Sequence, residues 1–263
     1  MICPFVLYAN SLWVAVGTNG QIITSPDALS WTPRYSPVTH DLNEITYGNG
    51  VFVVVGDNNY QPNATILTSP DGVAWDQHSY PSGKNARAIA FANGLNVIAL
   101  NDGGILYGND ATLYYNWLNA TTGINQNGAN LRGVTWSNSL WVAVGNDGRI
   151  LTSTNAQTWR SRLAPTYENL HAVRSINNTF IAIGNQGTIL QSAPLVPQML
   201  LAREGNQLRL ILSSPYEGVF KLQQTDNFIW NDFVNLTNAT GTAEYVVPLP
   251  PGSGQKFFRV IAP

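Results

Sequence analysis

The chain alternates short runs of apolar residues with turns rich in Gly, Asn, Asp and Ser, and this alternation repeats along most of its length. The apolar run that marks the repeat is centred on Trp13, Phe52, Asn96, Trp141 and Phe180, so that it recurs about every 40 residues. A period of about 40 residues, made of short strands and glycine-rich turns, predicts a β-propeller or a related array of small antiparallel sheets.

Each repeat is expected to contain four strands. A first strand ends in an aromatic residue and a turn, as in "EITYGNG", the apolar run forms a second strand, and "IITS" or "RILTS" forms a third. A tryptophan then opens the fourth strand, at Trp31, Trp75, Trp117 and Trp159. Because stacked sheets bury both faces, Trp31, Trp75 and Trp159 are expected to be buried between sheets. The first strands should hold equivalent apolar residues at Ile45, Ile89, Val134 and Val173.

The repeats predict an all-β protein made of a five-bladed β-propeller followed by a small β-sandwich. The blades span about 4–38, 42–80, 86–121, 131–164 and 170–193, so that the propeller covers residues 1–193. The fifth blade has no tryptophan to open a fourth strand, and the proline-rich stretch after it indicates a domain boundary. Residues 194–263 lose the period but contain five strand-like stretches separated by turn residues, which predicts the sandwich.

Three turns carry a resemblance to known families. The segments "SPDALSW", "SPDGVAW" and "STNAQTW" resemble the Asp-box turn of sialidase-like propellers, each one residue shorter than usual. The longer repeat is similar to that of bacterial secreted propellers and, more loosely, of photosystem II assembly-factor propellers. Beyond the repeats, "FKLQQTDNFIW" and "KFFRV" resemble C-terminal modules of bacterial secreted proteins, which implies a role in attachment or assembly.

Composition excludes several classes of partner and site. Charged residues make up 11% of the chain, against about 25% in typical proteins, and the net charge is −2. Without a basic stripe, nucleic acid is not an expected partner. Cys3 is the single cysteine, so that neither an internal disulfide nor a cysteine-based zinc site is expected. No apolar run reaches the roughly 18 residues of a membrane span, and no signal peptide is recognised.

The sequence offers little catalytic chemistry. Glycoside hydrolysis needs two carboxylates at a fixed separation, whereas only Glu44 and Asp41 lie near the start of a first strand. The histidines His40, His78 and His171 fall in three different repeats without the spacing of metal ligands. We therefore expect no catalytic residue, no cofactor and no metal.

Two groups of residues are candidates for ligand binding. Asn43, Arg87, Arg132 and His171 occupy equivalent positions where first strands begin, with Glu44 beside them. In a propeller these positions converge on one end of the central channel, which makes them a candidate ligand ring. The alternative is that the arginines cap strands and pair with nearby carboxylates. Tyr60, Tyr114 and Tyr115 are candidates for stacking on sugars.

Low charge, many Asn and Thr residues and the resemblance to secreted propellers together predict a non-enzymatic extracellular or cell-surface protein. Its expected role is structural or adhesive, as the repeating subunit of a surface filament or matrix, with copies of itself or extracellular polymers as partners. The alternative is a glycan-binding, lectin-like propeller, and a third possibility is a degenerate glycoside hydrolase.

Overall fold

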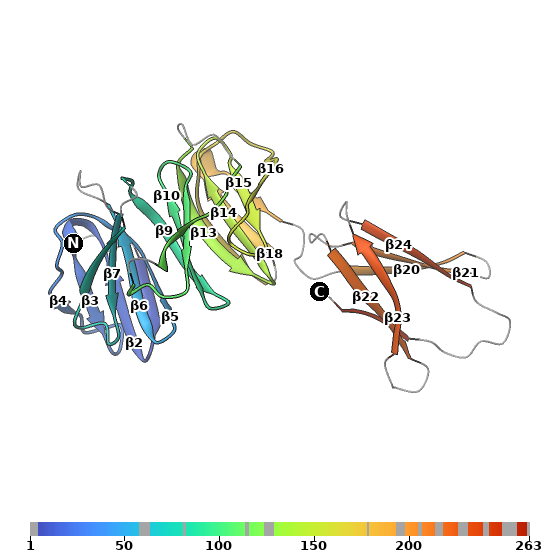
Figure 1. Cartoon of the computed structure of the whole chain (residues 1–263), viewed down its shortest axis with the longest axis horizontal. Helices are drawn as coiled ribbons and strands as arrows, with labels where there is room; N and C mark the ends of the chain where they lie inside the picture. Colours follow the sequence, from blue (N-terminus) through green and yellow to red (C-terminus); the bar gives the residue numbers. More distant parts are fainter. Residues whose placement is uncertain are drawn as a thin grey trace. The chain divides into compact units, whose positions relative to one another are not determined.

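The protein is built almost entirely of antiparallel β-strands (Figure 1). The computed structural model describes residues 5–57, 64–80, 83–113, 116–123, 129–177, 179–192, 198–204, 207–213, 218–225, 231–238, 242–248 and 257–261. Over these residues, no helix is both long enough and apolar enough to cross a membrane. The chain divides into two compact units, Met1–Ile176 with Ile181–Gln191, and Asn177–Phe180 with Ser192–Pro263.

The first unit contains four sheets of four antiparallel strands, each following the chain order. The first two sheets are β1 (Phe5–Ala9), β2 (Leu12–Val16), β3 (Ile22–Ser25), β4 (Thr32–Arg34) and β5 (Leu42–Gly48), β6 (Val51–Gly56), β7 (Ala64–Ser69), β8 (Asp76–Tyr80). The next two are β9 (Ala86–Ala92), β10 (Leu95–Leu100), β11 (Ile105–Gly108), β12 (Leu118–Asn119) and β13 (Leu131–Ser137), β14 (Leu140–Gly145), β15 (Ile150–Ser153), β16 (Arg160–Arg162).

A fifth sheet has three strands over the described residues: β17 (Leu170–Ile176), β18 (Thr179–Gly184) and β19 (Ile189–Gln191). The sequence also predicted a fifth repeat without a tryptophan-headed fourth strand. Ile183 and Ile189 are 49% and 70% exposed, whereas every residue of β14 is buried. The fifth sheet therefore has exposed apolar residues, whereas the second strand of the fourth sheet is buried.

Equivalent residues repeat along the first strand of each sheet. Ile45, Ile89, Val134 and Val173 are each the fourth residue of β5, β9, β13 and β17, and all are buried, as the repeat predicted. Successive first strands pack side by side, from β1 to β17, and Figure 1 shows the sheets following one another in chain order.

The predicted turns before the fourth strands are present. In each, a Ser hydroxyl donates to an Asp or Asn side chain two residues on, and that side chain accepts two backbone N–H groups. Trp75 and Trp159 are 7% and 3% exposed, and each indole N–H donates to a turn carbonyl. Trp31 makes the same bond but is only half-buried, because it lies in the first sheet and no described sheet precedes it.

The second unit contains two three-stranded antiparallel sheets. One is β20 (Gln198–Glu204), β21 (Gln207–Ser213) and β24 (Thr242–Pro248), and the other is β23 (Asn231–Asn238), β22 (Gly218–Thr225) and β25 (Phe257–Ile261). The β20 strand was not predicted, because it lies in the stretch interpreted as a boundary. Leu210, Leu212 and Val247 are buried, and Arg209 pairs with Glu244 at 2.5 Å.

Candidate functional site

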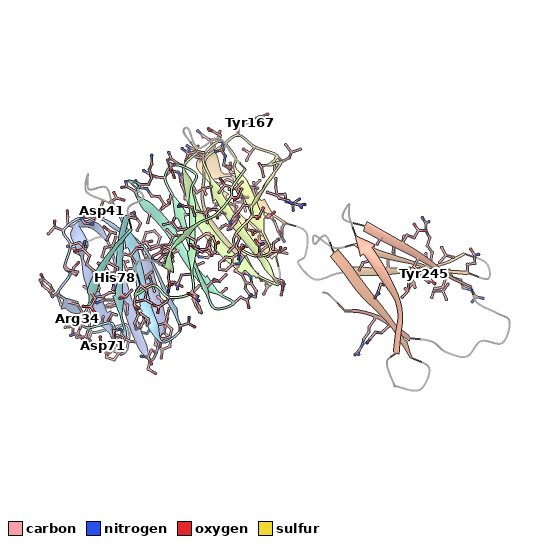
Figure 2. The ribbon with its side chains drawn as sticks, in the orientation of Figure 1. Arg34, Asp41, Asp71, His78, Tyr167 and Tyr245 are labelled. Atoms are coloured by element: carbon pink, nitrogen blue, oxygen red, sulfur yellow. The ribbon has the colours of Figure 1, made fainter. Side chains whose placement is uncertain are left out.

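The first strands of all five sheets in the first unit surround one cavity of about 330 Å³. Its lining runs from Phe5 and Leu7 on β1 through Ile45 and Ile89 to Val134, with Arg174 on β17. Figure 2 places Asp41 and Tyr167, which precede β5 and β17, toward one end of this unit, and Asp71, which follows β7, toward the other. The first strands therefore begin at the end marked by Asp41.

Two residues in this cavity depart from the repeat. The third residue of the first strand is small in three sheets, at Ala88, Gly133 and Ala172, but it is Glu44 in β5. The fifth residue is uncharged in three sheets, at Thr46, Ala90 and Thr135, but it is Arg174 in β17. The structure brings these two exceptional residues together across the cavity.

Glu44 and Arg174 form a hydrogen-bonded ion pair between the second and fifth sheets. The backbone N–H of Ile89 donates to the other carboxylate oxygen of Glu44 at 3.0 Å. Burial raises the pKa of Glu44, and this effect exceeds the opposing effects of the Arg174 charge and the Ile89 N–H. The Arg174 side chain is about half-exposed, so that the pair has one buried and one hydrated end.

The four predicted ring residues lie on neighbouring strands at the second position of each first strand. Three of them bond the residue 14 positions later, just after the second strand of the same repeat: Asn43 with Asp57 at 2.7 Å, Arg132 with Asn146 at 2.7 Å, and His171 with Asn185 at 2.6 Å. These bonds tie the start of each first strand to the end of the second strand.

Arg87 follows a different pattern, because it pairs with Asp57 of the preceding sheet at 2.9 Å. Asp57 thus accepts from Asn43 and Arg87 together, and Asn43 also donates to the carbonyl of Ala86 at 2.9 Å. Arg132 and His171 instead bond neutral amide oxygens. The alternative interpretation, that the arginines pair with nearby carboxylates, therefore describes Arg87. A ligand role for the ring stays a prediction.

The remaining predicted site residues fall elsewhere. Tyr60, Tyr114 and Tyr115 lie outside the described residues. His40 and His78 each bond a threonine hydroxyl, at Thr65 and Thr68. Within the described part of the chain, no three His, Cys, Asp or Glu residues gather as a metal site would require.

Arg174 was not predicted as a site residue. An alignment of the first strands by their buried fourth residue could have revealed it. In that alignment Arg174 is the charged residue at a position where the other strands have Thr46, Ala90 and Thr135. Asp57 was missed because it lies after β6, and its contact with Arg87 crosses between sheets.

Solved structures with this arrangement of sheets share little sequence with the chain. YCF48 bound to D1 peptide is 20% identical, with a TM-score of 0.55 over 95% of this chain and 94% of that one. YCF48 from Cyanidioschyzon merolae is 13% identical, with a TM-score of 0.55 and 95% coverage of both chains. Virginiamycin B lyase from Staphylococcus aureus is 11% identical, with a TM-score of 0.56 over 93% and 94%. No curated protein matches the chain.

A family model described as photosynthesis system II assembly factor YCF48 matches residues 20–193. This match overturns the function predicted from composition and resemblance. The secreted, adhesive or filament-forming role, the lectin alternative and the extracellular location are wrong, and so is the prediction of self-association or extracellular polymers as partners. The low proportion of charged residues did not determine the location or the partner, because charge bears on solubility and non-specific association. The chain belongs to the YCF48 family of photosystem II assembly factors.

Proposed function

We propose that this protein is a non-catalytic assembly factor that holds a segment of another polypeptide while a photosystem II complex is put together. The family supports this proposal, as does one similar structure, that of YCF48 bound to D1 peptide. The likeness to streptogramin B lyases, at 9–11% identity, concerns the fold and not the activity.

The finer architecture belongs to the same proposal. Residues 1–193 form a five-bladed propeller, which is supported by one cavity lined from the first strands of five sheets. Residues 194–263 form a small β-sandwich, which is supported by the two three-stranded sheets of the second unit. We assign the sandwich to attachment or assembly.

The polypeptide segment binds at the end of the propeller where the first strands begin. The observation that carries this placement is the row of Arg87, Arg132 and His171 on three neighbouring strands. Arg132 bonds the amide oxygen of Asn146, so its positive charge is not neutralised by that partner, and it can pair with a carboxylate of a bound peptide.

The carboxylates near this row support binding and not catalysis. Glu44 is held by Arg174 and Asp57 by Arg87, so each carboxylate already has a cationic partner. General acid–base catalysis needs a group within reach of the substrate proton. Both side chains are instead fixed in structural ion pairs.

Binding can be measured by titrating the purified protein with a set of overlapping peptides that covers D1. At least one peptide should bind, and its affinity should fall about tenfold in an Arg132→Gln, His171→Gln variant, which corresponds to about 1.4 kcal/mol. Affinity should also fall with rising salt, because the contacts are charged. Arg160→Gln, on the outer strand β16, is the matched control and should bind as the wild type does. Equal loss in both variants, or no binding by any peptide, would refute this site.

A further inference from the structure

The second strand of each repeat carries an aromatic residue at one position, with a single exception. The equivalent residues are Trp13, Phe52, Trp141 and Phe180, and in the third sheet Asn96. Asn96 is paired with Phe91 and Gly108, as Phe52 is paired with Tyr47 and Ser69, so the equivalence holds in the strand register.

The aromatic residue fills the space between two sheets. Phe52 is fully buried and clusters with Val14 and Ile22 of the first sheet, and its ring centre lies 4.7 Å from that of Tyr47 and 6.5 Å from that of Trp75 in its own sheet. Trp141 is 1% exposed and lies 6.4 Å from Trp136. An aromatic side chain at this position therefore supplies a large buried apolar surface.

At Asn96 the corresponding space is a pocket of about 260 Å³, which we call the Asn96 pocket. Val51 and Val53 on β6 and Ala111 form its apolar wall, and Asn49 and Asp110 lie at its polar rim. Trp117 packs in the same apolar cluster as Val53 and Ala111. A cavity of about 150 Å³ with apolar walls already holds a benzene ring, so there is room for a larger ring here.

The floor of the pocket has an unmet hydrogen-bonding capacity. Asn96 is 3% exposed, and over the described residues its Oδ1 atom has no hydrogen-bond partner. The rim groups already have partners: Asp110 accepts from the N–H and hydroxyl of Thr112, at 2.8 and 2.6 Å, and the Asn49 amide donates to the carbonyl of Asn109 at 3.2 Å. A buried acceptor without a partner is costly, and a bound donor would remove that cost.

We propose that the Asn96 pocket binds a planar aromatic group that carries one N–H or O–H donor. The ring takes the place of the Trp or Phe present in the other repeats, and the donor bonds Asn96 Oδ1. Indole and phenol have this chemistry, either as Trp and Tyr side chains of a polypeptide or as free small molecules.

The pocket is independent of the proposed peptide site. It lies beside the turn from β5 to β6 and the loop before β12, whereas Arg87, Arg132 and His171 lie where the first strands begin. Loss of binding at one site should leave the other unchanged, so that the two proposals can fail separately.

The test compares indole with benzofuran, which has nearly the same shape but no N–H donor, by calorimetric or NMR titration of the full chain. The wild type should bind indole at least about tenfold more tightly than benzofuran. In Asn96→Leu, which keeps the size but removes the acceptor, the two affinities should become equal. In Asn96→Phe, which restores the residue of the second and fifth repeats, neither compound should bind, and the melting temperature should rise.

Several outcomes would overturn the proposal: no indole binding to the wild type, equal affinity for indole and benzofuran in the wild type, or indole binding retained by Asn96→Phe. If Asn96→Phe does not fold, Asn96→Leu decides the question alone. Binding found only in a Tyr114→Ser, Tyr115→Ser variant would mean that the chain's own tyrosines occupy the pocket, which also overturns it. A blocked Gly-Trp-Gly peptide separates the two sources: if it competes with indole, the ligand can be a side chain, and if it does not, the ligand is a free molecule.

Discussion

The Glu44 side chain is an acidic group in a place where the repeat uses Ala or Gly. Its carboxylate is buried, and its two charged or polar partners come from other sheets, Arg174 from the fifth and the Ile89 N–H from the third. A buried carboxylate costs free energy unless it is paired and hydrogen-bonded. The pair therefore links sheets that are not adjacent in sequence, and its energy depends on pH.

Removal of Arg174 should destabilise the protein at neutral pH and much less at acidic pH. In Arg174→Ala the carboxylate of Glu44 stays buried without its cation, which should cost about 3 kcal/mol of unfolding free energy at pH 7. Burial raises the pKa of Glu44 above its ordinary value of 4.5, so the folded state binds a proton more readily than the unfolded state. The contribution of Glu44 to stability is thus fully present below pH 4.5, and it is lost as the pH rises through the pKa of Glu44 in the folded state.

Denaturant unfolding of wild type and Arg174→Ala between pH 4 and 8 measures this effect. Glu44→Gln with Arg174→Ala is the matched control, because it removes the buried charge and should show a much smaller dependence on pH. A constant difference between wild type and Arg174→Ala across that range would contradict the assignment.

Individual residues show which features could be predicted from the sequence and which could not. Ile45 and Val173 were placed correctly, because a buried strand position recurs with the period of the repeat. The partnership of Glu44 with Arg174 could not be predicted, because it joins residues 130 positions apart and depends on the curvature of the sheet array. The β20 strand was missed although the sequence Gly-Asn that follows it is a typical signal for a two-residue hairpin, and Glu204 pairs with Gln207.

In the turns before β4, β8 and β16, one side chain organises the backbone. Asp71 accepts from the N–H groups of Val73 and Ala74 at 2.8 and 3.0 Å, and these bonds lower its pKa. Asn155 makes the same contacts with Gln157 and Thr158. A neutral amide therefore accepts the same two backbone bonds as a carboxylate does.

We expect Asp71→Ala to cost about 1 kcal/mol, as loss of a helix-capping side chain does, while Asp71→Asn should cost only part of that at pH 7, because it keeps the accepted bonds but loses the charge. Since its pKa is lowered in the folded state, Asp71 stabilises the protein above its ordinary value of 3.8, and this contribution is lost as the pH falls below that value. Thermal melts at pH 7 and pH 3 test both points. A similar loss of stability in Asp71→Asn and Asp71→Ala at pH 7 would show that the charge, and not the accepted bonds, matters.

In the first unit, hydrogen bonds connect each sheet to the next sheet or to the segment that leads into it. Gly148 donates its N–H to the carbonyl of Glu168 at 2.9 Å, in the segment that leads to β17. A Cβ at Gly148, where φ is +66°, would lie 1.9 Å from the carbonyl oxygen of Thr166. At the equivalent Gly187, where φ is +71°, nothing lies within 4 Å of such a Cβ.

These two glycines form a matched pair. Gly187→Ala should cost about 1 kcal/mol, from the left-handed backbone alone. Gly148→Ala should cost a further 1–3 kcal/mol, roughly, because the new methyl group overlaps a neighbouring carbonyl. Chemical unfolding of the two variants measures the difference. Equal losses of unfolding free energy would mean that the close contact between Gly148 and the segment before β17 contributes little to stability.

The exposed face of the fifth sheet has a consequence for local unfolding and for peptide binding. A sheet with an exposed apolar face opens at a lower free energy than one that is buried throughout, so β17 and β18 should exchange their amide hydrogens before β13 and β14 do. His171 is on β17, and a peptide that engages it binds the closed form of that sheet alone. Occupancy of the row at the strand starts would thus slow local opening at Ile183 and Ile189, on strands that follow β17 and that no peptide at His171 needs to touch.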